Sequence, residues 1–303
     1  MEKGILKYSD KEIEILEDCR ICPRECGVNR FEQKGTCGMG VDIYVSSVNL
    51  HFGEEPPISG SGGSGTVFLS GCNMNCIFCQ NYPISQMGHG AKFSVEKLAK
   101  GMVNLQKRGA HNINFVTPSH YVVQVRRVII TAREMGLEIP IVYNTSGYDS
   151  IEALRFLEGY IDIYMPDIRY ALGELSKKYS GVDDYPEINR LAIEEMHRQV
   201  GDLEIGDDGI AKKGLIVRHL LLPENISATD KAMKFLTEEI SMETYVSFMS
   251  QYFPAHKTAG IERNNYKPMH RRINAEEYYQ MLKYLEDSGI QNGWIQPCPE
   301  ENL

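Results

Sequence analysis

The chain has 303 residues and a mass of 34.3 kDa, which at about 150 residues per domain suits one large domain or two smaller ones. Its hydrophobic fraction of 42% is typical of a globular protein that can bury a core without disulfide staples. The net charge of −9 argues against a nucleic-acid-binding protein that depends on a basic face.

The sequence shows neither a membrane span nor a secretory signal. Its most apolar stretches, 122–131 and 215–222, contain arginine and fall short of the ~18 apolar residues that a span needs. Residues 1–18 are charged throughout and lack the apolar centre of a signal peptide. We therefore expect a cytoplasmic protein without membrane or nucleic-acid partners. In that reducing setting, closely spaced cysteines bind metals more often than they form disulfides.

Residues 1–65 form an N-terminal extension that carries four of the eight cysteines, Cys19, Cys22, Cys26 and Cys37. Four thiols are the closed ligand count of a structural zinc site. The same four thiols suit an auxiliary [4Fe–4S] cluster, and composition does not choose between the two metals. The glycine- and serine-rich stretch 59–65, which closes the extension, predicts a flexible entry to the first strand, with tight packing of its backbone around the second cysteine group as the alternative.

A second cysteine group follows the strand-like run 66–70, with the spacing Cys72-x3-Cys76-x2-Cys79. Three thiols without a close fourth ligand leave a structural zinc site incomplete, unless a distant residue completes a zinc knuckle. A [4Fe–4S] cluster that is held by three cysteines keeps one iron open to an outside ligand. An open metal position is what a catalytic site requires, so the spacing favours a catalytic cluster.

This motif resembles the signature of the radical S-adenosylmethionine (SAM) superfamily. Phe78, directly before the last cysteine, fits the aromatic residue that family members place beside the adenine. Residues 52–57 and 80–82 resemble one branch, the proteins similar to pyruvate formate-lyase activating enzymes. The resemblance covers residues 19–296 and implies a [4Fe–4S] cluster on the three cysteines, SAM as cofactor, reductive cleavage of SAM and abstraction of a hydrogen atom from a substrate.

Beyond the motif, apolar strand-like runs alternate with amphipathic segments, which predicts βα units around a parallel sheet. The predicted strands are Thr66–Ser70, Asn112–Thr117, Ile139–Asn144, Ile161–Pro166, Leu215–Leu222 and Thr244–Ser250. The predicted helices are Ser94–Arg108, Val122–Met135, Ser150–Leu157, Glu187–Val200 and Ala228–Ile240. Six units between residues 66 and 254 are too few for a closed eight-unit barrel of ~250 residues. We predict an α/β fold, an incomplete (β/α)6 TIM-like barrel, with residues 255–303 as a C-terminal tail packed on it.

Functional groups of parallel βα barrels sit at the carboxyl ends of the strands. The polar residues at these positions, which we predict to bind SAM, are Thr117, Ser119, Asn144, Thr145, Ser146, Asp167, Arg169, Arg218 and Gln251. Amides and hydroxyls suit the ribose and methionyl groups, and arginine suits the carboxylate. Asp167 and Arg169 resemble the acidic-x-basic pair of the activating enzymes. Residues 117–120 replace the Gly-Gly-Glu with which many members receive the amino group of SAM.

Some residues near these positions have a more ordinary interpretation. His219 is more often a packed strand histidine than a catalyst. The segment around His51, Glu54 and Glu55 predicts a solvated loop, and Cys298 has no sequence partner and predicts a surface thiol.

The sequence as a whole predicts a radical SAM enzyme that acts on a protein, a peptide or a small molecule, with activation of a glycyl-radical enzyme as one form of that activity. It would receive electrons from a donor such as flavodoxin or ferredoxin. From other functional classes, a non-catalytic iron–sulfur electron carrier and a zinc-stabilised binding module remain alternatives, because either could use the same cysteines.

Overall fold

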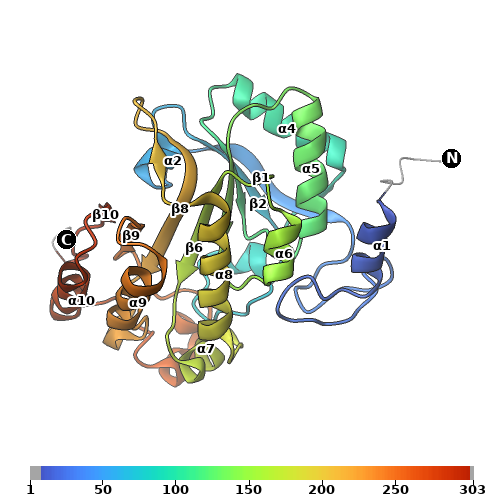
Figure 1. The fold of residues 1–303 in the computed structure, drawn as a ribbon. Coiled ribbons are helices and arrows are strands. Elements are labelled where there is room, and N and C mark those ends of the chain that lie inside the picture. Colours follow the sequence, from blue (N-terminus) through green and yellow to red (C-terminus); the bar gives the residue numbers. More distant parts are fainter. Residues whose placement is uncertain (1–7, 301–303) are drawn as a thin grey trace.

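The computed structural model describes residues 8–300, and one large sheet runs through them (Figure 1). Its parallel strands pair in the order β2 (Ser64–Leu69), β4 (Ile113–Val116), β5 (Ile141–Thr145), β6 (Ile163–Ile168), β8 (Ala211–Leu220), β9 (Tyr245–Met249) and β10 (Gly293–Ile295). The antiparallel strands are β1 (Ile43–His51) beside β2, β3 (Ala91–Phe93) beside β1, and β7 (Glu204–Ile205) beside β8. Every residue of β5 and β6 is buried, which explains their continuous apolar character.

Helices follow most of the parallel strands and cover the outer face of the sheet (Figure 1). The α-helices of the described residues are α1 (Asp10–Glu17), which precedes the sheet, α2 (Pro56–Ser59), α3 (Tyr82–Ser85), α4 (Val95–Lys107), α5 (Val122–Glu134), α6 (Ile151–Phe156), α7 (Gly173–Ser180), α8 (Tyr185–Val200), α9 (Thr229–Phe235) and α10 (Ala275–Ser288). Helix α4 begins as its sequence indicates, because the Ser94 side chain accepts a hydrogen bond from the Lys97 backbone N–H. Its apolar stripe packs into the main core together with α5 and the strands beneath.

The sheet does not close into a barrel, because β3 and β10 form its two ends. The predicted incomplete (β/α)6 barrel is confirmed, and its six strands are β2, β4, β5, β6, β8 and β9. The sheet continues past residues 65 and 254, since β1 precedes the first of these positions and β10 follows the second. The division of the chain into three parts at these positions stays a prediction.

The glycine- and serine-rich stretch 59–65 is packed, so the prediction of a flexible linker is wrong. A Cβ atom on Gly62 would lie 2.1 Å from a backbone oxygen of the neighbouring loop, which only glycine allows. The fully buried Asn112 side chain donates to the Ile58 carbonyl at 2.7 Å and accepts from the Ser64 hydroxyl at 2.7 Å. The small residues in this stretch are explained by close contact between backbones, not by a need for conformational flexibility.

The N-terminal extension packs against the loop that carries the second cysteine group. The Arg24 side chain donates to the Asn73 carbonyl at 2.7 Å and to the Gly181 carbonyl at 3.1 Å. The Ser150 hydroxyl, at the start of α6, donates to the Ile21 carbonyl at 2.8 Å. The extension thereby fixes one side of the candidate site.

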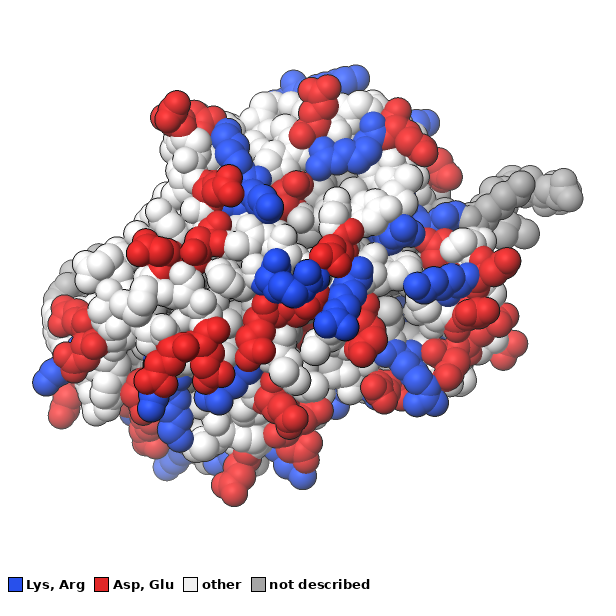
Figure 2. All heavy atoms as spheres, viewed as in Figure 1, with Lys and Arg blue, Asp and Glu red and all other residues white. Residues whose placement is uncertain are grey.

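No helix among residues 8–300 combines the length and the apolar character that crossing a bilayer demands. On the face drawn in Figure 2, basic side chains are interspersed with acidic ones and do not gather into a broad basic surface.

Candidate functional site

A cavity of about 370 Å³ lies where the parallel strands end. The predicted residues that line it are Cys72, Cys76, Cys79, Thr117, Asn144, Thr145, Ser146, Asp167, Arg169, Arg218 and Gln251. They come from the ends of β2, β4, β5, β6, β8 and β9 or from the loops that follow. The parallel arrangement therefore gathers at one place side chains that lie up to 179 residues apart in the sequence (251 − 72).

The loop between Cys72 and Cys79 has no regular secondary structure, and its neighbours hold its backbone in place. The N–H groups of Asn75 and Ile77 donate to the carbonyls of Ser180 and Tyr179, at 3.1 Å and 2.9 Å. These carbonyls belong to the last turn of α7, where helix carbonyls lack partners inside the helix. Arg24 joins the loop to the same end of α7, because it donates to the Asn73 and Gly181 carbonyls.

The three thiols lie at the edge of the cavity and have polar contacts. Burial raises the pKa of Cys72 to about 12 and also raises the pKa of Cys79. The Cys76 sulfur accepts hydrogen bonds from Arg169 Nη1 at 3.3 Å and from Ser180 Oγ at 3.1 Å. Buried thiols of this kind ionise at neutral pH only beside a strong positive charge, and a metal centre supplies one.

The number of thiols distinguishes between a structural zinc ion and a cluster. A closed zinc site needs four ligands, and the thiols that line this cavity are Cys72, Cys76 and Cys79. A [4Fe–4S] cluster bonds each cysteine to a different iron, so three thiols hold it and leave one iron open. The donor set of the cysteine loop therefore fits a three-thiolate cluster.

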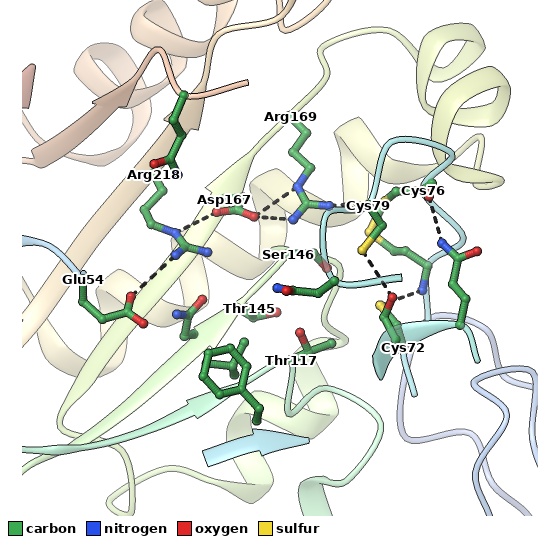
Figure 3. Close-up of a pocket in the computed structure, with 18 of the residues that line it drawn as sticks. Glu54, Cys72, Cys76, Cys79, Thr117, Thr145, Ser146, Asp167, Arg169 and Arg218 are labelled. Atoms are coloured by element: carbon green, nitrogen blue, oxygen red, sulfur yellow. Dashed lines mark hydrogen bonds and ion pairs between the residues drawn. The ribbon is translucent and has the colours of Figure 1, made fainter. Parts of the chain in front are cut away.

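A chain of charged side chains crosses the cavity toward this loop, as Figure 3 shows. The Asp167 carboxylate accepts from Arg218 Nε at 2.8 Å and from Arg169 Nε at 3.0 Å. Burial alone would raise the pKa of Asp167, but attraction to both arginines outweighs burial and lowers it. Arg218 also lies 4.0 Å from the Glu54 carboxylate, whose pKa burial raises. The predicted pair Asp167–Arg169 and the predicted clamp Arg218 are thus parts of one network.

Another wall of the cavity is formed by polar residues at the ends of β4 and β5, namely Thr117, Asn144, Thr145 and Ser146. Thr117 has a φ of +59°, a left-handed conformation that is strained for a β-branched residue. This conformation favours glycine, so the backbone of Thr117 is held here by its surroundings. The Ser146 hydroxyl is buried without a hydrogen-bond partner among the described residues. Ser119 is the predicted residue that does not reach the cavity, because it lies behind Thr145 and contacts that hydroxyl at 3.0 Å.

An adjoining cavity of about 210 Å³ shares part of its lining with the first, namely Cys76, Cys79, Asn81, Asp167, Arg169, Arg218 and Gln251. Phe78, Leu220 and Met249 give this second cavity one apolar wall. Phe78 is buried and packs edge-on against Tyr252. The aromatic residue that we predict beside the adenine therefore lies in an apolar wall next to the cysteine loop.

Several residues of the cavity were not predicted. The Glu54 side chain is only 9% exposed and lies beside Arg218, and Glu55 is buried, so the expected solvated loop is wrong at these two positions. His51 and Phe68 line the same side, and Asn81 and Gln86 line the cysteine side. Phe68 could have been found, since it lies on the predicted first strand. Glu54 could not, because its burial depends on contacts between segments far apart in the sequence.

Six other residues that the sequence singles out lie away from the cavity. His219 is fully buried and contacts the Ile168 carbonyl and the Thr229 hydroxyl, and burial lowers its pKa to about 4, which suits a packed, neutral side chain. Cys298 is 1% exposed, so the prediction of a surface thiol is wrong. The four N-terminal cysteines lie outside both cavities, in the segment that packs behind the Cys72 loop.

The sequence model described as the Radical SAM superfamily matches residues 66–236, which is more than half of the chain. Two proteins of Methanocaldococcus jannaschii, both named as uncharacterized, are similar along most of their length. MJ0674 is 28% identical over 282 residues, covering 90% of this chain and 75% of its own length. MJ0808 is 22% identical over 271 residues, covering 80% of this chain and 72% of its own length.

Solved structures with a similar fold include SuiB of Streptococcus suis bound to S-adenosylmethionine, with a TM-score of 0.50 and 12% identity over 75% of this chain and 48% of that one. HydG, a maturase of the [FeFe]-hydrogenase, gives a TM-score of 0.52 and 12% identity over 75% of this chain and 50% of that one. Native anSMEcpe with bound AdoMet gives a TM-score of 0.51 and 16% identity over 72% of this chain and 57% of that one. This chain spans about half the length of these proteins, and at such identities the likeness concerns the fold alone.

The charge network makes Asp167 important for stability. Asp167→Asn leaves two arginines without their shared carboxylate, and we expect a loss of about 3 kcal/mol in the free energy of unfolding at pH 7. The folded pKa of Asp167 lies below its ordinary value of 3.8, so its contribution is present above about pH 4 and disappears as the pH falls further. Urea unfolding at pH 7 and at pH 3.5 measures this contribution. We expect the free energies of unfolding of the variant and the wild type to differ less at pH 3.5 than at pH 7.

Asp183→Asn is the matched control, because Asp183 and its partner Lys177 are exposed and such pairs contribute little. If Asp167→Asn unfolds at pH 7 in the same urea concentration as the wild type, the network does not stabilise the site.

Proposed function

The chain belongs to the radical SAM superfamily, and on this premise we propose that it is an enzyme that binds a [4Fe–4S] cluster and SAM in the cavity and takes a hydrogen atom from a substrate. The observation that carries the proposal is the convergence, at two adjoining cavities, of three cysteines, a charge network and an apolar wall beside Phe78. Binding of SAM beside a cluster needs all three of these features.

Each group of residues has a role in this proposal. Cys72, Cys76 and Cys79 would hold the cluster and leave one iron free for an outside ligand. When bound, the cluster and SAM supply the one-electron cleavage of the sulfonium that is the family's source of radical chemistry. The chain's own residues bind, orient and exclude water around that chemistry.

The cavity walls match the parts of SAM. Arg218 presents a guanidinium to its carboxylate, with Asp167 fixing the orientation of that guanidinium. The polar wall at the end of β5 offers amide and hydroxyl groups to the ribose and methionyl part, from Asn144, Thr145 and Ser146. The Ser146 hydroxyl has no hydrogen-bond partner among the described residues, so it is free to bind a ligand atom. The apolar wall of the second cavity, formed by Phe78, Leu220 and Met249, suits the flat adenine.

Electrons would come from a one-electron carrier such as flavodoxin or ferredoxin, in a reducing cytoplasm where the thiols stay reduced. The substrate is a protein, a peptide or a small molecule. The resemblance to activating enzymes makes a glycyl-radical enzyme the first protein substrate to test, by electron paramagnetic resonance for a glycyl signal after incubation with SAM and reductant.

The central test uses Cys76→Ala. Anaerobically reconstituted wild type, given SAM and dithionite, should form 5′-deoxyadenosine and methionine, and Cys76→Ala should form neither above background. Chromatography of the nucleoside products measures this, and Cys298→Ala serves as the cysteine control that keeps wild-type activity. Product formation by Cys76→Ala at the wild-type rate would defeat the proposal. Absence of product from the wild type would favour an electron carrier or a binding module.

Ser180 provides a test that does not depend on activity. Its hydroxyl donates to the Cys76 sulfur and contacts the buried Tyr170 hydroxyl at 2.8 Å. Hydrogen bonds to cluster sulfurs raise reduction potentials because they stabilise the added negative charge. We expect Ser180→Ala to lower the midpoint potential of the cluster by up to about 60 mV, a tenfold change in a one-electron equilibrium. A redox titration followed by electron paramagnetic resonance measures it.

The control for this variant is Ser176→Ala, on the same helix. Ser176 is equally buried but its hydroxyl donates to the Gly173 carbonyl instead. An unchanged potential in Ser180→Ala, with full cluster content, would show that this hydroxyl does not act on the cluster.

A further inference from the structure

The segment between α1 and β1 gathers the four N-terminal cysteines into one compact, hydrogen-bonded turn structure. Cys19, Cys22 and Cys37 are buried, Cys26 is partly buried, and none of the four takes part in a disulfide. The segment is closed by backbone hydrogen bonds from Cys19 to Val28 and from residue 27 back to Cys19. A packed segment of this size rarely contains four free thiols for structural reasons alone. Three features of their surroundings indicate that they bind a ligand.

The first indication is the backbone around the sulfurs. Cys22, Cys26 and Cys37 each have a hydrogen bond from the backbone of the residue two positions further along the chain. Cys72 and Cys79 of the catalytic loop have the same contact. Backbone N–H groups that face sulfur favour the thiolate, the form that binds metals. The two cysteine groups thus share a local geometry that sequence spacing alone does not impose.

The second indication is a gap that glycine leaves open. A Cβ atom on Gly35 would lie 3.1 Å from the Cys26 sulfur and 3.6 Å from the Cys37 sulfur. Gly35 has an ordinary backbone conformation, so no turn requires glycine there. The absence of a side chain keeps the space between these two sulfurs clear.

The third indication is a buried charge. Arg30 is 2% exposed and donates to the Gly40 carbonyl at 2.7 Å, to the His120 carbonyl at 3.2 Å and to the Cys19 sulfur at 3.4 Å. Among residues 8–300, no carboxylate lies within ion-pair distance of this guanidinium. A buried cation without an anion is costly. Four thiolates around a doubly charged metal core carry excess negative charge, and Cys19 would present that charge directly to Arg30.

The choice between a zinc ion and a cluster rests on the likeness of the two cysteine groups. The same backbone contacts at the sulfurs as in the Cys72–Cys79 loop favour the same kind of centre in both. We propose that Cys19, Cys22, Cys26 and Cys37 bind a second iron–sulfur cluster of the [4Fe–4S] type, with Arg30 as its counter-charge. Its four thiolates close the cluster to outside ligands, unlike the three of the catalytic site.

The position of this second site connects it to the first. The Cys72 backbone N–H donates to the Cys37 carbonyl at 3.4 Å, so one hydrogen bond links the two cysteine groups. A Cβ atom on Gly71 would lie 2.8 Å from the same carbonyl, which shows how closely the two backbones approach. A second cluster would therefore lie directly behind the catalytic loop.

The test measures iron, sulfide and zinc in the full chain after anaerobic reconstitution. We expect about eight irons in the wild type and about four in two variants, Cys72→Ala/Cys76→Ala/Cys79→Ala and Cys22→Ala/Cys37→Ala. Native mass spectrometry identifies the clusters by mass. Arg30→Gln should lose the second cluster or lower its potential, whereas Arg20→Ala, with an exposed side chain in the same segment, should retain about eight irons.

The variant that lacks the three catalytic cysteines leaves the N-terminal segment untouched and decides the proposal even if the other variant fails to fold. About four irons in it support the second cluster. No iron, or one zinc per chain, overturns it. If the second cluster is overturned in this way, formation of 5′-deoxyadenosine by the wild type would leave the proposed function standing. Conversely, a wild type that holds both clusters but forms no 5′-deoxyadenosine would contradict the proposed function alone.

Discussion

The position of the Cys72–Cys79 loop depends on hydrogen bonds that come from elsewhere in the chain. The loop has no helix or strand of its own. It is held by the last carbonyls of α7 and by Arg24, which donates both to the loop at Asn73 and to Gly181, directly after α7. Helix ends and arginine side chains are good partners here, because both have unused hydrogen-bonding groups. The rigid sheet brings the strand ends together, and these contacts fix the three thiols relative to them.

The charge network shows how a polar cavity can exist at the end of an apolar sheet. Asp167 lies on a strand whose residues are all buried, and its carboxylate is tolerated because two arginines share it. Arg169 extends this network to the Cys76 sulfur, and Arg218 extends it to Glu54. Charge on the thiol side of the cavity is therefore coupled to charge on the opposite wall, so a ligand that binds one end acts on both.

Much of the fold could be predicted because parallel strands buried on both faces appear as continuous apolar runs, as in 139–144 and 161–166. Short or half-exposed elements gave no such signal. Strand β10 has three residues and only partial burial, and α7, which holds the cysteine loop, is short and polar. Strand ends identified most of the cavity in advance. The burial of Glu54 and Cys298 depends on tertiary contacts, which local patterns do not contain.

The central claim is that three thiolates leave one iron of a cluster open and that SAM binds there. The most direct measurement is electron–nuclear double resonance on the reduced enzyme with SAM labelled by ¹⁵N at its amino group and ¹⁷O at its carboxylate. The account predicts hyperfine coupling of both labels to the cluster, which shows direct bonding to the open iron. A cluster that forms fully but shows no coupling to either label, or one with four protein ligands, would contradict it.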